Sequence, residues 1–354
     1  MRTWRWMARA AIFAGGSFGF GGAGLQAAPP APNPTVTALS PIDRTAISSY
    51  VDYYATLLQS AVQSDRMVRD RRALLAPLRR PQQPPSAVFS EHYASTLTTT
   101  LQPLLNRPTL ALNVMITLAK ARDLATQPAL QAGLTNSNAA VRYWAAWGLA
   151  RIWPEVEQIP PAFQQAIAAV ETALGRETDP VVMRQLCATL LAANPQANPK
   201  LLAAAPLVIA ALRKIAATYA KAPPDNAQVA ADIVMQLHTW LDDGAVLTDA
   251  QKNAAMTALT ELISFPAQYW NAGALDTASQ PQVTRLIAAG LDAMNAVSPT
   301  ADFSIRGLGA ASTPTQVGGI LLQINELTGS QGQKGRVQKL FPLVPIPPRI
   351  PGGA

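Results

Sequence analysis

Apolar residues recur at intervals of three and four positions along most of this chain, from about residue 41 to residue 327. This is the period of an amphipathic α-helix, and the alternation of β-branched and polar residues that marks a strand is nearly absent. Proline, asparagine or aspartate separates most of the periodic segments, as expected at helix N-caps and first turns. The pattern predicts helices over residues 43–63, 65–76, 86–105, 109–124, 127–134, 139–152, 161–174, 180–193, 200–220, 227–241, 249–264, 280–296 and 315–327.

Four of these segments align with one another as repeats. The equivalent residues are Leu110, Val141, Val182 and Val229, then Val114, Ala145, Leu186 and Ile233 four positions later, and Leu118, Leu149, Leu190 and Leu237 eight positions later. Successive repeats begin 31, 41 and 47 residues apart. Irregular spacing in this range is typical of stacked helical hairpins, because no single hairpin can bury its apolar face alone. The sequence therefore predicts an all-α fold, an α-solenoid of stacked antiparallel helical hairpins.

The stretch NSNAAVRYWAAWGLARI, residues 136–152, shows both sides of one such helix. At about 100° per residue, an apolar stripe from Val141 to Ile152 faces the repeat core, where Gly148 lets a partner helix approach closely. Asn138 is placed to cap the helix, a contribution of about 1 kcal/mol. Tyr143 and Trp147 lie on the opposite side, one turn apart, where they can touch one another.

This stretch resembles the second helix of a HEAT repeat. The matching residues are the capping Asn138, the pair Val141 and Arg142, and the core residues Ala145, Ala146, Leu149 and Ile152. The stretch DPVVMRQLCATLLAA matches more loosely, with Met183 in place of the arginine. The resemblance covers one helix closely and about a third of the chain more loosely. It implies an irregular HEAT- or armadillo-like solenoid that acts as a scaffold, with Arg142 making structural bonds between repeats.

In the family that this helix resembles, polar residues of the concave surface usually occupy the positions of Tyr143 and Trp147. Here both are aromatic, and the equivalent positions of the preceding repeat are Leu112 and Ile116. Two interpretations follow. Either the four residues form an open patch that binds a partner, or a helix, the loop after residue 297 or the C-terminal tail covers them.

Positive charge is concentrated in residues 66–80, which contain six arginines. Arg66, Arg69 and Arg72 are candidate anion-binding residues, because a basic run can hold phosphates or anionic glycans. The alternative is a solvated helix face followed by a proline-rich turn. Basic residues interleaved with aromatic ones, as nucleic-acid binders use, are absent, so no nucleic-acid partner is expected.

Catalytic and metal-binding motifs are scarce in this chain. Two histidines and one cysteine, Cys187, exclude an intramolecular disulfide and a sulfur-rich zinc site, and neither a P-loop nor an HExxH motif occurs. His238 precedes two aspartates and is either a possible base or a surface or core histidine. Phe265, Tyr269 and Trp270 form either a carbohydrate platform in a loop or the filling of a helix corner. No catalytic residue, cofactor or metal is expected.

The N-terminus has the pattern of a secretory signal. Arg2, Arg5 and Arg9 precede an uncharged, glycine-rich apolar run that ends at Leu25-Gln26-Ala27, so we expect cleavage after Ala27. Removing this segment lowers the net charge from +7 to +4, with 25 basic and 21 acidic residues left. The expected product is periplasmic or extracellular and has no membrane span.

The domain organisation follows from these patterns. We expect a signal peptide over residues 1–27, a proline-rich linker over 28–40 and a helical-repeat domain over 41–297. A long loop over 298–314, a helical segment over 315–340 and a proline-rich tail over 341–354 follow. The loop is either functional or mobile, and the tail either packs along the body or stays disordered.

The predicted function is an exported, non-catalytic scaffold that binds a protein or peptide in the cell envelope. The alternative is an α/α-toroid-like protein that binds or cleaves carbohydrate, since helical hairpins with aromatic loops also suit that architecture. Such an enzyme needs converging carboxylates in one cleft, whereas the acidic residues of this sequence are scattered. A glycan therefore remains an alternative partner.

Overall fold

The computed structural model describes residues 27–61, 63–79, 84–192, 204–243 and 246–350 of this chain. Within them lie fourteen α-helices and, outside the helices, one isolated β-bridge between Ser330 and Gln333. The helices are α1 (Pro41–Ser60), α2 (Ser64–Leu75), α3 (Ala87–Leu101), α4 (Pro108–Ala121), α5 (Gln127–Gly133), α6 (Ala139–Glu157), α7 (Pro160–Arg176), α8 (Pro180–Leu190), α9 (Ala204–Tyr219), α10 (Ala227–Asp242), α11 (Asp249–Asn271), α12 (Gln280–Val297), α13 (Pro314–Thr328) and α14 (Arg336–Leu340). The predicted signal segment, apart from Ala27, lies outside the described residues.

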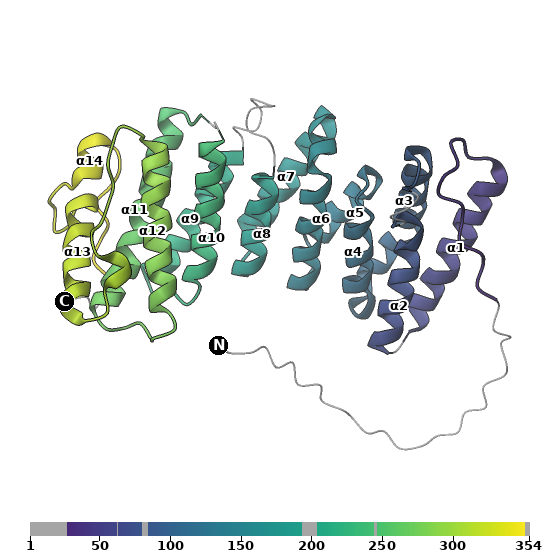
Figure 1. Ribbon diagram of the computed structural model, residues 1–354, viewed down its shortest axis with the longest axis horizontal. Coiled ribbons are helices and arrows are strands. Elements are labelled where there is room, and N and C mark those ends of the chain that lie inside the picture. Colours follow the sequence, from purple (N-terminus) through teal and green to yellow (C-terminus); the bar gives the residue numbers. More distant parts are fainter. Residues whose placement is uncertain (1–26, 62, 80–83, 193–203, 244–245, 351–354) are drawn as a thin grey trace, which may run out of the picture.

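The helices form two layers that run along the long axis of the molecule (Figure 1). In the even-numbered layer, α2 packs on α4, α4 on α6, and so on to α12. The odd-numbered layer continues from α5 through α7, α9 and α11 to α13, and α1 packs on α3 at the N-terminal end. Each odd-numbered helix up to α11 also packs against the even-numbered helix that follows it. The predicted all-α solenoid of stacked hairpins is therefore confirmed.

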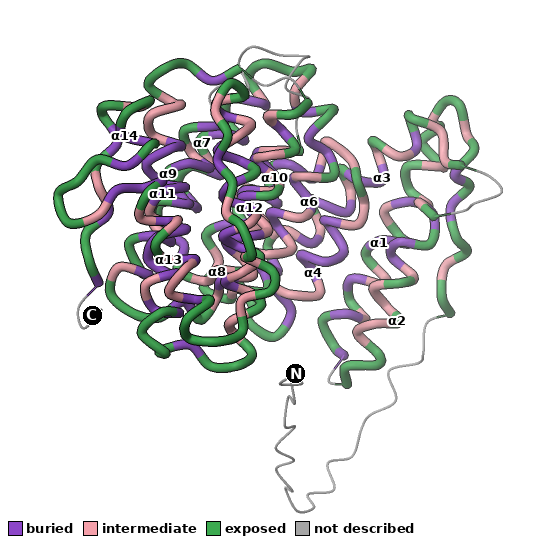
Figure 2. Tube along the Cα trace, turned by 60° about the vertical axis from the view of Figure 1, so that its left-hand side comes forward, coloured by how far each residue is buried: buried purple, intermediate pink, exposed green. Residues whose placement is uncertain are grey.

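The core lies between the two layers, as Figure 2 shows by the buried residues on the inner sides of the helices. The aligned repeat residues account for much of it. Those four and eight positions into each repeat are all fully buried, from Val114 and Leu118 in α4 to Ile233 and Leu237 in α10. The periodicity in the sequence therefore marks the stripe that each even-numbered helix buries against its partner.

Local capping explains where several helices begin. Ser40 and Asp43 form a reciprocal capping box at α1, and Asn138 accepts a hydrogen bond from the amide of Ala140 at 2.9 Å. Asp179 caps α8 through the amides of Val181 and Val182. The predicted cap at Asn138 is thus confirmed. Each cap satisfies amide groups that have no partner inside the helix.

Two helices continue past prolines at which the sequence predicts an end. Helix α6 extends beyond Ile152 through Pro154 to Glu157, and α11 extends beyond Ser264 through Pro266 to Asn271. Proline removes one helical hydrogen bond and costs about 3 kcal/mol in a helix interior. Buried side chains on either side of each proline offset that cost, so the predicted ends were wrong.

The loop of residues 298–314 packs against its neighbours. Phe303 is fully buried. The side chain of Asn295 forms two hydrogen bonds with the backbone of Phe303: it accepts from the Phe303 amide at 2.8 Å and donates to the Phe303 carbonyl at 3.1 Å. Arg306 is held in the same way by Gln323 of α13. Within the loop, Leu308–Ala310 form a short 3-10 turn. The side-chain amides of Asn295 and Gln323 therefore supply backbone hydrogen bonds that a helix or strand would otherwise provide in this loop.

The described part of the proline-rich tail packs along the body. Val344 and Ile350 are buried, and the backbone of residues 348 and 350 is bound by Gln268 of α11. Both the loop and the tail lie at the α13 end of the array (Figure 1). Within the described residues, neither the loop nor the tail covers α4 or α6.

Candidate functional site

Helix α6 places the predicted aromatic residues on the side opposite its core stripe. Val141, Ala145 and Leu149 are fully buried, whereas Tyr143 and Trp147 are half-buried. Gly148 explains how closely α6 lies against α4: a Cβ atom there would be 2.9 Å from the Cα of Ala119. The close approach of these helices brings side chains of α4 within reach of the aromatic residues of α6.

The aromatic residues form a cluster of three rings. Trp144 contacts Tyr143 with ring centroids 6.1 Å apart and Trp147 with centroids 5.2 Å apart, both edge to face. This geometry is favourable because the positive edge of one ring meets the negative face of another. The helical spacing lets Tyr143 and Trp147 touch one another, and the structure places Trp144 in contact with both.

Two cations flank this cluster. The Nζ atom of Lys120 on α4 lies 5.2 Å from the ring centre of Trp144, and the guanidinium of Arg151 lies 4.7 Å from that of Trp147. Contacts of this kind contribute about 0.5–1 kcal/mol each at exposed sites. We call Lys120, Tyr143, Trp144, Trp147 and Arg151 the basic–aromatic face. Sequence reasoning found Tyr143 and Trp147 and missed the other three.

The sequence contains a local indication of the Arg151 contact but none of the Lys120 contact. Arg151 follows Trp147 by one helical turn, so spacing within α6 points to this contact. Lys120 lies on another helix, and only the packing register of α4 against α6 brings it to Trp144. The contact of Lys120 with Trp144 has no local signature in the sequence.

The apolar residues of the preceding repeat occupy different environments. Ile116 is 8% exposed and belongs to the core, whereas Leu112 is half-buried and packs at its edge. The exposed area at Ile116 is therefore too small to contribute much to an open patch. Leu112 lies on the same helix as Lys120 and remains a predicted contact of a partner.

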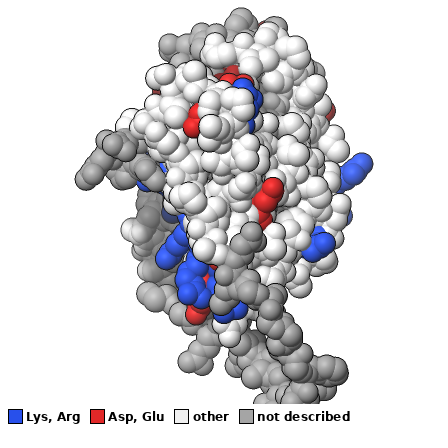
Figure 3. Space-filling view, turned by 90° about the vertical axis from the view of Figure 1, so that its right-hand side faces the viewer, with Lys and Arg blue, Asp and Glu red and all other residues white. Residues whose placement is uncertain are grey.

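The arginines of α2 lie at the N-terminal end of the even-numbered layer. Arg66, Arg69 and Arg72 are exposed, and Figure 3 shows blue side chains gathered at the lower left of this end of the molecule, at the level of α2 in Figure 1. Arg71 points across to α4 and donates to the Oδ1 of Asn113 at 2.9 Å. The predicted anion-binding role of the exposed three stays a prediction.

Electrostatic coupling links these arginines to α4. Burial, with Arg71, Arg79 and Arg72 as further causes, lowers the pKa of Lys120. Burial and the neighbouring Arg72 and Arg79 likewise lower the pKa of Arg71. Like charges thus accumulate where α2 meets α4, next to the basic–aromatic face.

Arg142 joins two repeats, as the resemblance implies. Its Nε and Nη2 atoms bind the two carboxylate oxygens of Glu177 at 2.7 and 2.9 Å. Its Nη1 also donates to the carbonyls of Asn136 and Ser137. The residue connects the turn before α6 to the turn before α8, a structural role.

The remaining candidate residues have structural environments. Cys187 is fully buried, and burial raises the pKa of its thiol to about 12, so it behaves as a small core residue. His238 lies on the surface of α10, with its Nε2 3.2 Å from the carboxylate of Asp242 one turn later. Phe265, Tyr269 and Trp270 are buried within α11 rather than displayed in a loop. The carbohydrate-platform interpretation was therefore wrong, because α11 continues through Pro266.

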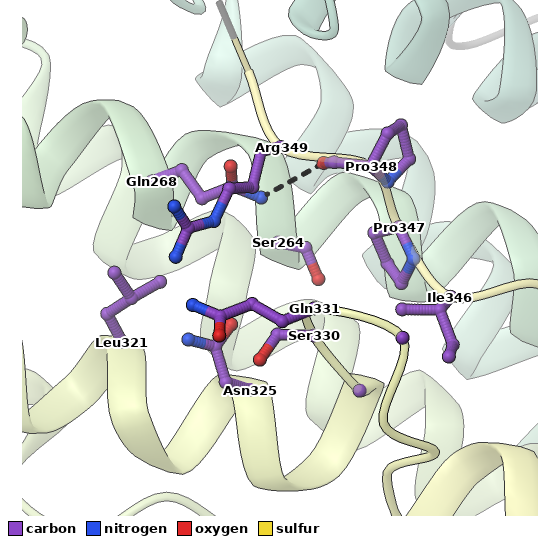
Figure 4. A pocket seen from close by; sticks show the side chains of 12 residues that line it. Ser264, Gln268, Leu321, Asn325, Ser330, Gln331, Ile346, Pro347, Pro348 and Arg349 are labelled. Carbon is purple, nitrogen blue, oxygen red and sulfur yellow. Dashed lines mark hydrogen bonds between the residues drawn. The ribbon is translucent and has the colours of Figure 1, made fainter. Parts of the chain in front are cut away.

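A separate pocket of about 370 Å³ lies where the tail crosses α11 and α13 (Figure 4). Gln268 faces the tail across this pocket and donates to the carbonyl of Pro348 at 3.4 Å. Asn325 and Gln331 line the opposite side. The lining combines side-chain amides and hydroxyls with the apolar side chains of Leu321, Ile346, Pro347 and Pro348, and Arg349 is its one charged side chain among the described residues. This pocket is a product of tail docking.

Among the described residues, no group of three or more histidine, cysteine or acidic side chains is arranged to hold a metal ion. No helix within the described ranges is both long and apolar enough to cross a bilayer.

No protein-family model matches this sequence, and no curated protein matches it. Function must therefore be inferred from the site itself.

Proposed function

We propose that this protein is an exported, non-catalytic helical-repeat scaffold that binds a protein or peptide partner on its basic–aromatic face. The observation that carries this proposal is the three-ring cluster of Tyr143, Trp144 and Trp147, which stays partly exposed although the array has a continuous core in which other aromatic rings are buried. Tryptophan, tyrosine and arginine dominate the energetics of protein interfaces. All three residue types meet on this face.

The rigidity of the scaffold supports the same proposal. The rings project from α6, which is capped by Asn138 and held closely against α4 at Gly148. A partner that contacts preorganised side chains loses less conformational entropy on binding than one that must order them. The face is therefore suited to recognition without rearrangement.

Export is the second part of the proposal. It is supported by the basic residues before the apolar run of residues 10–25 and by the small residue Ala27 after it. The HEAT-like pattern around Arg142 supports the scaffold role, since proteins of that kind mostly bind other proteins. Together these features favour a partner in the periplasm or outside the cell.

The carbohydrate alternative receives less support. The helices form an open array, with α1 and α13 at opposite ends, rather than a closed toroid (Figure 1). The rings of Trp144 and Trp147 have cations over their faces, the surfaces that a sugar would stack on. The aromatic residues of α11 are buried. A polypeptide is therefore the partner that the geometry favours.

A peptide-display selection tests the proposal. A library of random sequence is selected on immobilised mature protein and, in parallel, on a variant with Tyr143→Ala and Trp147→Ala. We expect enriched sequences on the natural protein and loss of that enrichment on the variant. The far-ultraviolet circular dichroism of the variant serves as the control for folding. Equal enrichment on both proteins would place binding elsewhere and contradict the proposal.

A further inference from the structure

Arginines in the C-terminal half of the even-numbered layer are paired with a carboxylate. Arg184 of α8 binds one oxygen of Asp232 on α10 at 2.7 Å, and Arg285 of α12 approaches the other oxygen at 3.3 Å. One aspartate thus forms ion pairs with cations from the helices on both sides of it.

The cations at the other end of the same layer are arranged differently. Arg71 donates to the neutral amide of Asn113, and Lys120 and Arg151 lie over indole rings. Among the described residues, no ion pair involves these three cations or Arg79. Positive charge is therefore left without a carboxylate partner across α2, α4 and α6.

Mutual repulsion makes this arrangement costly until an anion arrives. The proximity of Arg71 and Arg79 adds to burial in lowering the pKa of Lys120. Repulsion of this kind falls when a carboxylate is inserted, because each new opposite charge favours the ionised form of its neighbours. A negatively charged partner would gain this energy on binding.

The nearest acidic residues of the chain do not fill this role. Asp70 is flanked by Arg66 and Arg69, which oppose the effect of burial on its pKa. Asp123 caps the turn after α4, and Glu91 and Glu155 act on its pKa together with burial. In the described structure none of these three carboxylates forms an ion pair with the cations of α2, α4 and α6.

We infer that the basic–aromatic face, extended by Arg71 and Arg79, takes an acidic polypeptide segment in extended conformation. Its carboxylates pair with the cations, while its apolar side chains lie against the exposed part of the aromatic cluster. The inference rests on the proposed function and names the chemistry of its partner.

The repeat geometry sets the spacing of the acidic residues. Neighbouring packed helices lie about 8–10 Å apart. A chain in the extended polyproline II conformation advances about 3.1 Å per residue and has three residues per turn, so every third side chain points the same way. A segment that crosses α2, α4 and α6 therefore meets a new helix about every third residue. Acidic residues at that interval match the successive cations Arg71, Lys120 and Arg151.

Two other polyanions fit less well. Base stacking and sugar stacking both need an open aromatic face. Lys120 and Arg151 occupy that position over Trp144 and Trp147, which also contact each other and pack against the core. Carboxylates on a flexible backbone need only the cations and the ring edges, so a peptide is favoured over a nucleic acid or a uronate glycan.

Fluorescence anisotropy with defined peptides tests the inference. The probe is a labelled peptide of about a dozen residues, with glutamate at every third position and leucine and serine between. The same peptide with lysine for glutamate is the control ligand. We expect binding of the acidic peptide that weakens about tenfold in a variant with Lys120→Gln and Arg151→Gln. The matched control carries Arg44→Gln and Arg306→Gln, two exposed arginines elsewhere with the same loss of net charge, and should bind as the natural protein does.

Charge reversal adds a readout that a merely structural role would not change. With Lys120→Glu and Arg151→Glu, the face should prefer the lysine peptide. Equal binding of both peptides, or equal weakening by the control pair, would overturn the inference. Tighter binding of heparin or duplex DNA than of the acidic peptide, lost in the same variant, would also overturn it and assign the face to another polyanion.

The display selection separates the failure of this inference from failure of the proposed function. If enriched peptides depend on Tyr143 and Trp147 but are neutral or basic, the proposed function stands and the acidic partner is wrong. If no enriched peptide depends on that face, both the proposed function and this inference are wrong.

Discussion

Arg142 and Glu177 form a two-point ion pair between α6 and the turn before α8, with N–O distances of 2.7 and 2.9 Å. The Glu177 side chain is 2% exposed and that of Arg142 is 19% exposed. Glu177 also accepts from the amides of Thr178 and Asp179. Because the carboxylate is buried and fully bonded, this pair holds two successive repeats in one geometry.

Breaking this pair should destabilise the protein strongly. Arg142→Ala leaves the buried carboxylate of Glu177 without its counter-ion, which costs about 3–5 kcal/mol in comparable sites. Urea denaturation followed by circular dichroism measures the loss. Arg176→Ala, at a neighbouring exposed arginine, is the control and should change stability by less than about 0.5 kcal/mol. A small effect of Arg142→Ala would mean that the backbone amides alone hold Glu177.

The same carboxylate should make stability depend on pH. Burial opposes the ionisation of Glu177, but hydrogen bonds from Arg142 and from the amides of Asp179 and Thr178 outweigh it and lower the pKa below 4.5. A carboxyl whose pKa is lower in the folded state stabilises the protein above its unfolded pKa, near 4.5, and loses that contribution as pH falls through the folded value. We expect Glu177→Gln to flatten the decline of the unfolding midpoint below pH 4.5. If the unfolding midpoint of the Glu177→Gln variant declines below pH 4.5 as steeply as that of the natural protein, other carboxyls cause the pH dependence.

Two glycines offer a paired test of helix packing. Alanine at Gly148 would place its Cβ atom 2.7 Å from Leu130 and 2.9 Å from the backbone of Ala119, so α4 and α6 must separate. Overpacking of this kind costs about 1–3 kcal/mol. Gly175, inside α7, has nothing within 4 Å of an added Cβ atom, so Gly175→Ala should stabilise the protein by up to about 1 kcal/mol. Thermal midpoints that shift in the same direction would contradict this account of Gly148.

Cys187 should be inert in the folded protein. Its burial and its pKa of about 12 leave almost no accessible thiolate at neutral pH. A thiol reagent in excess should therefore label it at the rate of opening or unfolding, and rapidly in denaturant. Fast labelling of the native protein at pH 8, measured by mass spectrometry, would show that α8 opens readily.

The end of the described tail is bound by one side-chain amide. Gln268 accepts from the amide of Ile350 at 2.9 Å and donates to the carbonyl of Pro348. Gln268→Ala removes both bonds, so hydrogen exchange of the Ile350 amide should accelerate at least about tenfold while the amides of α6 keep their protection. Gln164→Ala, at an exposed position on α7, is the control. Unchanged exchange at Ile350 would mean that burial of the tail residues is sufficient to hold it.

The sequence by itself determined the helical architecture. Apolar periodicity and capping residues such as Asn138 and Asp179 are local features, and each helix must bury its stripe wherever it packs. For this reason the helices and the alignment of repeats from Leu110 to Val229 were predictable. The ends of α6 and α11 were not, because the cost of Pro154 and Pro266 is local whereas the burial that offsets it comes from other helices.

Only the tertiary structure decided how the candidate residues combine. The sequence indicates two separate candidates, the arginines of α2 and the aromatic pair of α6, which are about 70 residues apart. Packing of α4 between these helices brings Lys120 to Trp144 and Arg71 to Asn113, and so places a cation of α2 and the aromatic cluster of α6 against the same helix. These contacts depend on the register of one helix against the next, which is set by close packing at residues such as Gly148. Periodicity specifies which side of a helix is buried, and it carries no information about which neighbour that side will meet.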